Sequence, residues 1–403
     1  MGKKTFYEVR NQLLSKVVVV EKEKVFLEAC AGRSLGEDVV AKYNVPSFER
    51  SPYDGYAFIA EDSKSASKEQ PITLQILEEI PAGELAHHKV TNGYAVKILT
   101  GAPIPEGADA VTMYERTEYT DTQVTIFEAF KSGSNIVKVG EDVKCGDILA
   151  TCGTVIDAGV VGVMAAQNIE EVVVYRIPKI GIISTGSELL CVGSEPEAGK
   201  IYNSNQYMLS VAVQQLGCEP IVLGMVKDSV TEICELIQKG LEICDMVLLT
   251  GGVSVGDYDL TPEAMEMAGV EILQQGVDLK PGMACAYGIK GKKLVCGLSG
   301  NPAAAITNFH AIVSSVIRKL CGRKDFLPEE FPVQMLNGFP KKSPTTRLLR
   351  GKMKITNGKV GIRIAKEQGN VVLSSTIECN LMVQIPAGSG PVEAGTGLKG
   401  FFI

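Results

Sequence analysis

Residues 179–186 read KIGIISTG and residues 245–252 read DMVLLTGG, and these two stretches decide the fold of the chain. A third apolar run, EPIVLGMV, covers residues 219–226. All three are rich in residues that favour buried strands, and short apolar runs of this length bounded by small or polar residues are typical of a sheet interior. They predict three strands of one sheet.

Segments with helical spacing separate these strands, at about residues 203–217 and 228–244. A further helix is expected to run to Leu320, with Asn301 as its N-cap and Pro302 in the first position. Strands that alternate with helices form a parallel sheet covered by helices. The predicted fold class is therefore α/β and β multidomain, with a doubly wound α/β domain at its centre.

The sequence on either side of this domain has a different pattern. Short alternating runs such as ITLQILEEI, at residues 72–80, are typical of β-strands and predict an inserted β domain. Helical spacing at residues 5–32 predicts two helices. After the last helix, short strands with an Asn357-Gly358 turn predict a small β-barrel. The predicted domains are 1–45 with 141–177 (helical and extended), 46–140 (inserted β), 178–326 (α/β) and 327–403 (C-terminal β-barrel).

Composition narrows the classes of function. The 403 residues contain no apolar stretch near the roughly 20 residues that a membrane span needs. A net charge of -7 argues against extended binding to nucleic acid, whose phosphates require clustered Lys and Arg. The 11 cysteines include no Cys-x-x-Cys pair, which argues against a disulfide framework or a structural zinc site. The chain has three histidines, and their positions argue against a Ser-His-Asp triad or a His-rich metal site. We expect a cytoplasmic protein.

A glycine-rich loop, at residues 250–259, follows the third strand. Gly251, Gly252 and Gly256 allow backbone amides to approach an oxyanion closely, and Ser254 adds a hydroxyl donor. Ligands of open α/β sheets bind at this carboxyl end of the strands, so the loop is a candidate phosphate site. The alternative interpretation is an ordinary tight turn.

Four carboxylates are expected at the same edge of the sheet. Asp257 and Asp259 lie in the glycine-rich loop, Glu188 follows the first strand and Asp228 follows the second. These carboxylates would repel an anionic ligand unless a cation lay between them and the ligand. We therefore expect Mg²⁺, with Asp228, Asp257 and Asp259 as candidate ligands of the metal. For Glu188 and Asp228 the competing explanation is a helix cap or a favourable first-turn charge.

Three other loops supply donors for an anionic ligand. Lys280 offers a cation, and the start of the last predicted helix, at Asn301 and Pro302, offers a helix dipole. The loop after the first strand adds three small or polar residues, Thr185, Gly186 and Ser187. Together these loops predict a composite anion pocket.

Seven motifs occur in the order found in one known family. They are SPYDGYA (51–57), LTGAP continuing to EGADA (99–110), GEDVK (140–144), STGSEL (184–189), GKIYNSN (199–205), TGGVSVGDYD (250–259) and KPG (280–282). With these motifs the chain resembles the molybdopterin molybdenumtransferase family, called MoeA in bacteria and the E-domain of gephyrin in animals. The resemblance runs nearly from end to end, and seven motifs in order are far more specific than any one of them.

The resemblance implies an activity and a set of partners. Such an enzyme inserts molybdate into adenylylated molybdopterin and releases AMP, with the pterin along the loops of a MoaB/MogA-like α/β domain and Mg²⁺ near Asp228 and Asp259. It implies a homodimer whose active site is shared, with Asp54 and Thr100 of one subunit facing the α/β domain of the other. A pterin adenylyltransferase and molybdoenzymes are expected partners. The implied catalytic set is Asp54, Thr100, Glu188, Asp228, Asp259 and Lys280.

The resemblance also implies where molybdate binds. It would lie near Ser254 and Lys280, together with a C-terminal arginine and serine. The best matches for these two are Arg347, in TTRLLRG, and Ser374 or Ser375, in VVLSSTIE. The register of the barrel decides whether Arg347 or Arg350 points to the site, because a one-residue error reverses the face of a strand.

Two positions depart from the family pattern and leave alternatives open. Met283 stands where a lysine is usual, and Ser299 replaces the first proline of the usual Gly-Leu-Pro-Gly-Asn-Pro loop. A specialised paralogue that uses tungstate, or serves one class of molybdoenzyme, is therefore one alternative. A pterin adenylyltransferase is another, against which the long segments flanking the α/β domain count. A non-catalytic dimeric scaffold is a third, which would have no need of clustered carboxylates.

Overall fold

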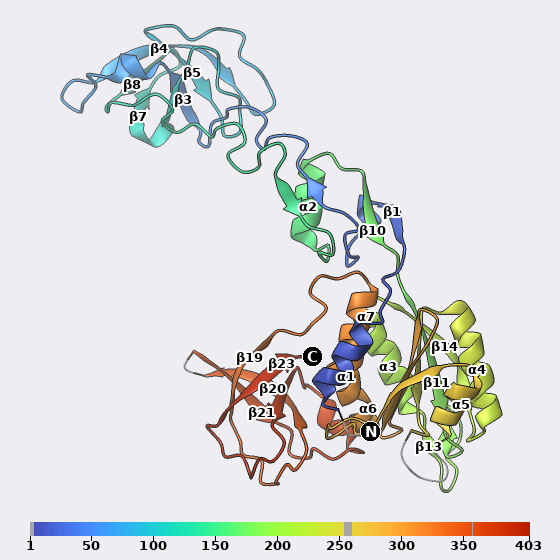
Figure 1. Cartoon of the computed structure of the whole chain (residues 1–403). Helices are drawn as coiled ribbons and strands as arrows, with labels where there is room; N and C mark the ends of the chain where they lie inside the picture. Colours follow the sequence, from blue (N-terminus) through green and yellow to red (C-terminus); the bar gives the residue numbers. More distant parts are fainter. Residues whose placement is uncertain (1–3, 254–259, 357) are drawn as a thin grey trace. The chain divides into compact units, whose positions relative to one another are not determined.

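The computed structural model describes residues 4–253, 260–356 and 358–403. The chain divides into two compact units (Figure 1). The large unit comprises the described residues up to Glu37, residues 151–161 and residues 170–403. The small unit comprises residues 38–150 and 162–169. Asp54 and Thr100 therefore belong to the small unit, whereas the predicted α/β site belongs to the large one.

A six-stranded sheet forms the centre of the large unit. In spatial order its strands are β14 (Glu219–Val226), β11 (Lys179–Thr185), β15 (Met246–Thr250), β18 (Lys293–Leu298), β17 (Cys285–Lys290) and β16 (Glu271–Gln275). The first four are parallel, and β17 and β16 add an antiparallel edge. β11 and β15 are buried almost throughout, as expected for strands covered on both faces.

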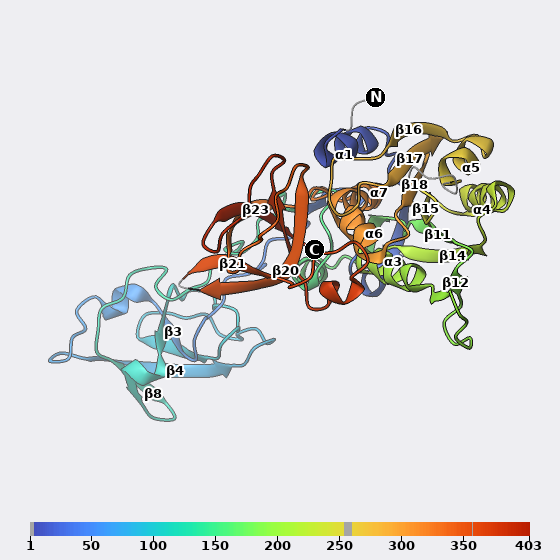
Figure 2. The same cartoon turned by 90° about the horizontal axis from the view of Figure 1, so that it is seen from below.

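Helices cover both faces of this sheet (Figure 2). One face carries α1 (Phe6–Leu14), α3 (Ser204–Gln215), α6 (Pro302–Asn308) and α7 (Ser314–Leu320), and the other carries α4 (Val230–Ile243) and α5 (Thr261–Met267). Alternate residues of β11 serve the two cores, since Ile182 packs under α3 and Ile183 under α4. A π-helical turn, η4 (Phe309–Val313), joins α6 to α7. The predicted helices are thus confirmed as α3, α4 and the α6–α7 helix, which begins at Asn301 and Pro302.

The prediction of a second helix within residues 5–32 is wrong. Residues Lys22–Phe26 form β1, which pairs with β10 (Glu171–Tyr175) in an antiparallel ribbon, and only a 3-10 turn, η1 (Leu27–Ala29), follows. The apolar spacing was compatible with a helix, but a partner strand distant in the sequence satisfies the backbone instead.

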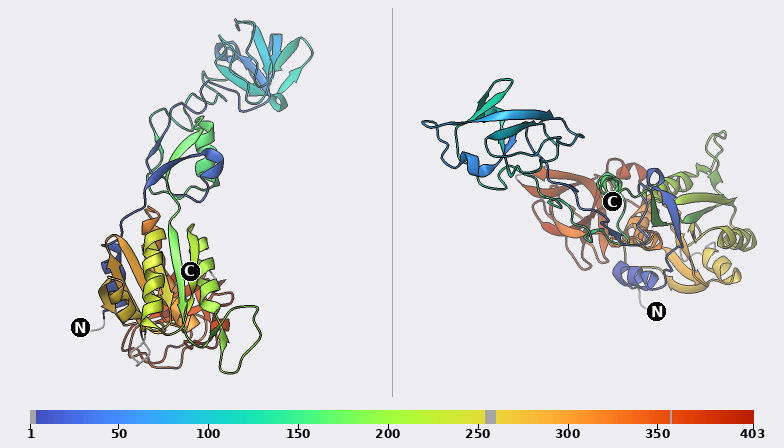
Figure 3. Two further views of the ribbon diagram at one scale, coloured as in Figure 1. Left: turned by 90° about the vertical axis from the view of Figure 1, so that its right-hand side faces the viewer. Right: turned by 90° about the horizontal axis from the view of Figure 1, so that it is seen from above.

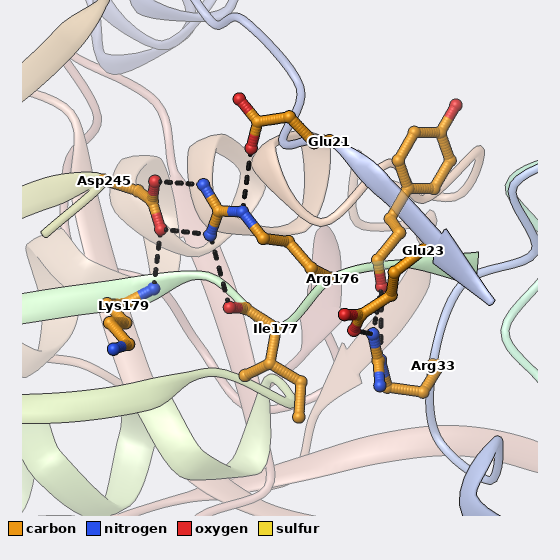
Figure 4. Close-up of polar contacts among 8 residues, drawn as sticks. Glu21, Glu23, Arg33, Arg176, Ile177, Lys179 and Asp245 are labelled. Carbon is orange, nitrogen blue, oxygen red and sulfur yellow. Dashed lines mark hydrogen bonds and ion pairs between the residues drawn. The ribbon is translucent and has the colours of Figure 1, made fainter. Parts of the chain in front are cut away.

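An arginine clamp joins this ribbon to the α/β sheet (Figure 4). The guanidinium of Arg176 donates hydrogen bonds of 2.8 and 2.6 Å to Asp245 and one of 2.8 Å to Glu21. Asp245 also accepts a bond of 2.8 Å from the backbone of Lys179, the first residue of β11. The clamp therefore lies at the amino end of the central strands, opposite the end where ligands of such sheets bind.

The small unit is built on a second six-stranded sheet (Figure 3). In spatial order its strands are β6 (Ala110–Met113), β3 (Gly55–Phe58), β5 (Tyr94–Ile98), β4 (Ile72–Ile80), β8 (Gln123–Ile126) and β7 (Thr117–Tyr119). Tyr56 and Phe58 enter one core and Ala57 the other, so both faces of β3 are buried. The shorter elements are β2 (Val39–Val40), paired with β9 (Ile148–Ala150), and the turns η2 (Ala60–Ser63) and η3 (Tyr114–Arg116).

A closed five-stranded barrel ends the large unit. Around the barrel the strands are β19 (Glu330–Met335), β21 (Lys359–Ile364), β20 (Arg347–Thr356), β22 (Leu381–Ile385) and β23 (Gly397–Phe402). Thr356 pairs with Lys359, and Asn357 of the predicted turn lies outside the described residues. Leu348, Met382 and Phe401 join the core of the α/β domain, so barrel and sheet pack together.

The predicted fold class is confirmed by these elements: an α/β domain, a β insertion and a C-terminal barrel. The remaining short elements are α2 (Ala158–Ala166), β12 (Leu189–Leu190), β13 (Ile201–Tyr202) and η5 (Leu373–Thr376). Among the helices of the described chain, none is long and apolar enough to cross a membrane.

Candidate active site

A cavity of about 510 Å³ opens at the carboxyl ends of β11, β15 and β18. Its walls come from the loops after these strands, from the first residues of α3 and α6, and from the segment around Val371 and Leu373. Eight of the predicted site residues line it: Thr185, Gly186, Glu188, Asp228, Gly251, Gly252, Asn301 and Pro302.

The glycines of the loop after β15 are required by its geometry. Gly251 has a φ of +105°, and a Cβ there would lie 2.2 Å from the carbonyl oxygen of Thr185. Gly252 has a φ of +58°, and a Cβ there would lie 2.9 Å from the hydroxyl of Thr261. The chain therefore makes a close approach here that only glycine allows. Of the same loop, Ser254, Gly256, Asp257 and Asp259 lie outside the described residues.

Asp228 and Ser187 hold the loops after β14 and β11 together. The backbone of Ser187 donates to the Asp228 carboxylate at 2.9 Å, and the backbone of Asp228 donates to the Ser187 hydroxyl at 3.3 Å. The cap of α4 is Ser229, whose hydroxyl accepts from Glu232, so Asp228 is not the helix cap. Glu188 precedes the short strand β12 rather than a helix. Capping explains neither carboxylate, although Asp228 lies one residue before the cap and so at the positive end of the α4 dipole.

Two helix N-termini point their first residues into the same cavity. The N-cap of α3 is Asn203, and the N-cap of α6 is Asn301. The side-chain amide of Asn205 donates to the Gly300 carbonyl at 2.8 Å and so ties the two helix starts together. The positive ends of the two helix dipoles favour an anion here. At α6 the first backbone amides already have partners within the chain, since Ala303 donates to Asn370 at 3.1 Å and Pro302 has no N–H. The sequence drew attention to the GKIYNSN motif, but neither Asn203 nor Asn205 was assigned to the site.

The donor set in the described part of this cavity fits Mg²⁺. Glu188 and Asp228 supply carboxylate oxygens to the cavity wall. Within residues 4–253, 260–356 and 358–403, no group of three or more Asp, Glu, His or Cys side chains could hold a metal ion. Two carboxylates suit a cation that keeps several waters and shares substrate phosphates, which is how Mg²⁺ is commonly bound.

Lys280 and Arg347 lie side by side through their backbones. The amide of Lys280 donates to Thr346 at 2.8 Å, and its carbonyl accepts from Leu348 at 2.9 Å. The Arg347 guanidinium stacks over the Phe339 ring, with 5.0 Å to the ring centre, and donates to the Ser343 hydroxyl at 3.2 Å. The pairing brings the two residues together, but the Arg347 side chain is engaged with the barrel.

Arg350 has very different surroundings. Its side chain is fully buried, and it donates to the Thr307 hydroxyl at 3.1 Å and to the Ser375 hydroxyl at 2.9 Å. Its Nε is buried without a partner in the described chain, and burial lowers the pKa of Arg350. Arg350 and His310 both line a second cavity, of about 490 Å³.

The structure therefore distinguishes between the two arginines, and between the two serines, that the sequence left as alternatives. Arg350, rather than Arg347, is joined to Ser375. Ser375 is buried, whereas Ser374 is exposed. Both serines follow the segment whose Val371 and Leu373 line the cavity of the α/β domain. The strand register, which fixes these faces, could not be obtained from the sequence.

In the small unit, Asp54 and Thr100 are in direct contact. The Asp54 carboxylate accepts a hydrogen bond of 2.7 Å from the Thr100 backbone and another of 2.7 Å from its hydroxyl. These two bonds lower the pKa of Asp54, so this exposed carboxyl stays ionised. The two residues singled out in the first third of the chain thus form one polar pair.

Comparison with known proteins identifies the family. Residues 4–167 match the model of the MoeA N-terminal region (domain I and II), and residues 181–319 match that of a probable molybdopterin binding domain. A molybdopterin molybdenumtransferase of Staphylococcus epidermidis is 37% identical over 392 residues, which cover 96% of this chain and 93% of the relative. The chain belongs to the molybdopterin molybdenumtransferase family.

Further members of the molybdopterin molybdenumtransferase family show the same extent of similarity. One from Staphylococcus aureus is 36% identical over 371 residues, covering 92% of this chain and 88% of the relative. The crystal structure of a molybdopterin biosynthesis MoeA protein from Pyrococcus horikoshii superimposes with a TM-score of 0.85 at 31% identity and covers both chains fully. The resemblance inferred from the seven motifs is confirmed.

Proposed function

We propose that this chain inserts molybdate into adenylylated molybdopterin and releases AMP, and that the reaction takes place at the cavity of the α/β domain. The observation that carries the proposal is the meeting of a glycine loop, two helix N-termini and two carboxylates in one cavity. Membership of the molybdopterin molybdenumtransferase family supports it. This combination suits an anionic, phosphate-containing substrate with a divalent cation.

The loops bind and orient the nucleotide part of the substrate in this proposal. Backbone amides at the start of α3 would donate to its phosphates, and the positive end of the α6 dipole would lie beside them. The Gly251 loop would allow the phosphates a close approach. Glu188 and Asp228 would hold Mg²⁺, which when bound supplies positive charge against the phosphates. The Asp228–Ser187 pair keeps that carboxylate in place. Positioning, rather than a nucleophilic side chain, is the main requirement of such phosphoryl chemistry.

The oxyanion is assigned to cationic and hydroxyl donors near the barrel, at the second cavity that Arg350 lines. The segment that contains Leu373 and Thr376 contributes to the walls of both cavities, so the proposal places the oxyanion beside this segment. Lys280 is kept in the proposed site, and Arg350 with Ser375 replaces Arg347 as the proposed C-terminal pair. Among the described residues the buried Arg350 guanidinium bonds only to hydroxyls, so its charge has no ion-pair partner there. Met283 and Ser299 leave the choice between molybdate and tungstate open. Ser299 is buried in the cavity wall, where its hydroxyl accepts from the Asn301 backbone at 3.2 Å.

The assembly of the enzyme is part of the proposal. A homodimer with a shared site would place Asp54 and Thr100 of one subunit at the substrate bound by the other. Mixing an Asp54→Ala variant with an Asp228→Asn variant should then restore up to about a quarter of wild-type activity, because random exchange of subunits leaves one intact site in each mixed dimer. No recovery in exchanged dimers would reject the shared site. The cytoplasmic location and the adenylyltransferase and molybdoenzyme partners stay predictions.

The test is AMP release from adenylylated molybdopterin with Mg²⁺ and either molybdate or tungstate. The wild type should release AMP in the presence of an oxyanion, and Asp228→Asn should be slower by about a hundredfold, the usual cost of losing an electrostatic group at a reacting centre. Glu235→Gln, on the exposed side of α4, is the matched control and should behave as wild type. A folded protein that binds the nucleotide but releases no AMP with either oxyanion would be a scaffold instead.

A further inference from the structure

We propose that Cys218 and Cys321 are a site of reversible oxidation, at which a peroxide converts two buried thiols into a disulfide. The two sulfur atoms lie 3.3 Å apart, although the residues are separated by 103 positions in the sequence. Cys218 is 5% exposed and Cys321 is 7% exposed, and both belong to the core that packs α3 and α7 on the sheet.

The positions of the two cysteines give the crosslink a structural consequence. Cys218 lies just after α3, and Cys321 caps the end of α7. At their other ends the same two helical segments begin in the cavity wall, where Asn205 bonds to Gly300. A disulfide would therefore fasten the far ends of the two helices that carry the walls of the proposed active site. The oxidation site itself does not depend on the proposed function.

The local electrostatics favour Cys321 as the sulfur that reacts first. The hydrogen bond that Cys321 shares with Cys218, in which either sulfur could donate, lowers the pKa of Cys321 and outweighs its burial, and the guanidinium of Arg323 lowers this pKa further. The same bond and burial raise the pKa of Cys218. Thiolates rather than thiols attack peroxides, so the two sulfurs take different parts in the reaction.

The reaction balances with hydrogen peroxide as the oxidant. The Cys321 thiolate attacks one peroxide oxygen, the O–O bond breaks, and a sulfenic acid and hydroxide form. The hydroxide takes up the proton that the Cys321 thiol had released and becomes water. The Cys218 sulfur then attacks the sulfenic sulfur, the S–O bond breaks, and a second water leaves with the Cys218 proton. Two thiols and one peroxide thus give one disulfide and two waters. The sulfurs need to close from 3.3 Å to about 2.05 Å. A dithiol reductant reverses the change.

Peptide mapping of the native full-length protein tests the proposal without any substitution. After peroxide treatment the remaining thiols are alkylated, the protein is unfolded and digested without reductant, and the peptides are analysed by mass spectrometry. We expect a peptide pair linked through Cys218 and Cys321 that disappears after dithiothreitol. The exposed Cys145 and Cys191 serve as internal controls for the oxidant. If both are fully oxidised while Cys218 and Cys321 remain thiols, the proposal is wrong.

A second measurement uses stability. The crosslink should raise the Tm by about 5 °C, because it closes a loop of roughly 100 residues in the unfolded chain. Cys218→Ser should lose this rise on oxidation, whereas Cys296→Ser, a change at another buried cysteine of the same domain, should keep it. An equal rise in Cys218→Ser and wild type would also overturn the proposal.

Discussion

Arg347 and Arg350 belong to the same strand, β20, but their guanidinium groups lie in different environments. Arg347 stacks on Phe339 and donates to Ser343, so its charge lies against an aromatic face near solvent. Arg350 is fully buried between Thr307 and Ser375, which offer hydroxyls and no negative charge. The first environment stabilises a cation by itself, whereas the second leaves a cation in need of an anion.

This difference shows how a ligand-binding arginine can be distinguished from an arginine that only stabilises the fold. A buried charge that is bonded but not neutralised costs free energy of folding, and proteins keep such charges mainly where a ligand compensates them. Arg350 fits that description and Arg347 does not. The proposed oxyanion site therefore depends on the pocket around Arg350, and the predictions below test this assignment.

The largest effect is expected for Arg350→Met. Removal of the guanidinium should raise the KM for molybdate by about a hundredfold, as for loss of a charge-assisted hydrogen bond to an anion. The KM for the adenylylated pterin should stay within about threefold, because the nucleotide is assigned to other loops. Arg350→Lys should recover part of the loss. Equal rises in both KM values would mean that the substitution has only damaged the fold.

The pH dependence of stability probes His310, which lines the same cavity as Arg350. Burial, with a smaller contribution from Arg318, lowers the pKa of His310 from 6.5 to about 4. Between these values the unfolded chain binds a proton that the folded chain excludes. The free energy of unfolding should therefore fall as the pH is lowered from about 6.5 to about 4, by at most about 3 kcal/mol. Denaturant titrations of wild type and His310→Asn at several pH values measure this dependence. The prediction is contradicted if the free energy of unfolding depends on pH as steeply in the variant as in wild type.

A matched pair of serines gives the next effect. Ser375→Ala removes the hydroxyl bonded to Arg350, and Ser343→Ala removes the one bonded to Arg347. We expect Ser375→Ala to raise the KM for molybdate by about fivefold, the size of one hydrogen bond, and Ser343→Ala to leave it unchanged. If Ser343→Ala raises the KM for molybdate more than Ser375→Ala does, the oxyanion site would have to be assigned to Arg347 instead.

Arg347→Met should have the smallest effect. The cation–π contact with Phe339 is lost, which should cost about 1 kcal/mol of stability and leave the KM for molybdate as in wild type. Thermal unfolding and oxyanion kinetics on the same preparation measure both quantities. A rise in KM comparable with that of Arg350→Met would remove the distinction between the two regions.

The sequence predicted those parts of the molecule whose signals are local. β11, β14 and β15 are apolar runs, α3 and α4 have helical spacing, and the Gly251 loop is recognisable from its glycines. β1 was not predicted because its partner, β10, lies far away in the sequence. The strands β16, β17 and β18 were also not predicted, although they follow one another in the chain and β17 pairs with β18 across a short turn.

For the site, the part of the cavity wall that follows β11, β14 and β15 could be predicted because these strands were predicted, and Asn301 was predicted as a helix cap. The contribution of Val371 and Leu373 was not predicted. The choice between Arg347 and Arg350 could not, because it depends on which face of β20 turns inward. Asn205 was missed for a related reason, since its role comes from a contact with Gly300 on another helix start.

The most direct test of the account is a single turnover in which the protein is loaded with adenylylated molybdopterin and Mg²⁺ before molybdate is added. The account predicts that AMP appears only after molybdate is added, in an amount equal to the bound substrate, and that at low molybdate Arg350→Met slows this release while Arg347→Met does not. Release of AMP without an oxyanion, or equal slowing in the two variants, would contradict it.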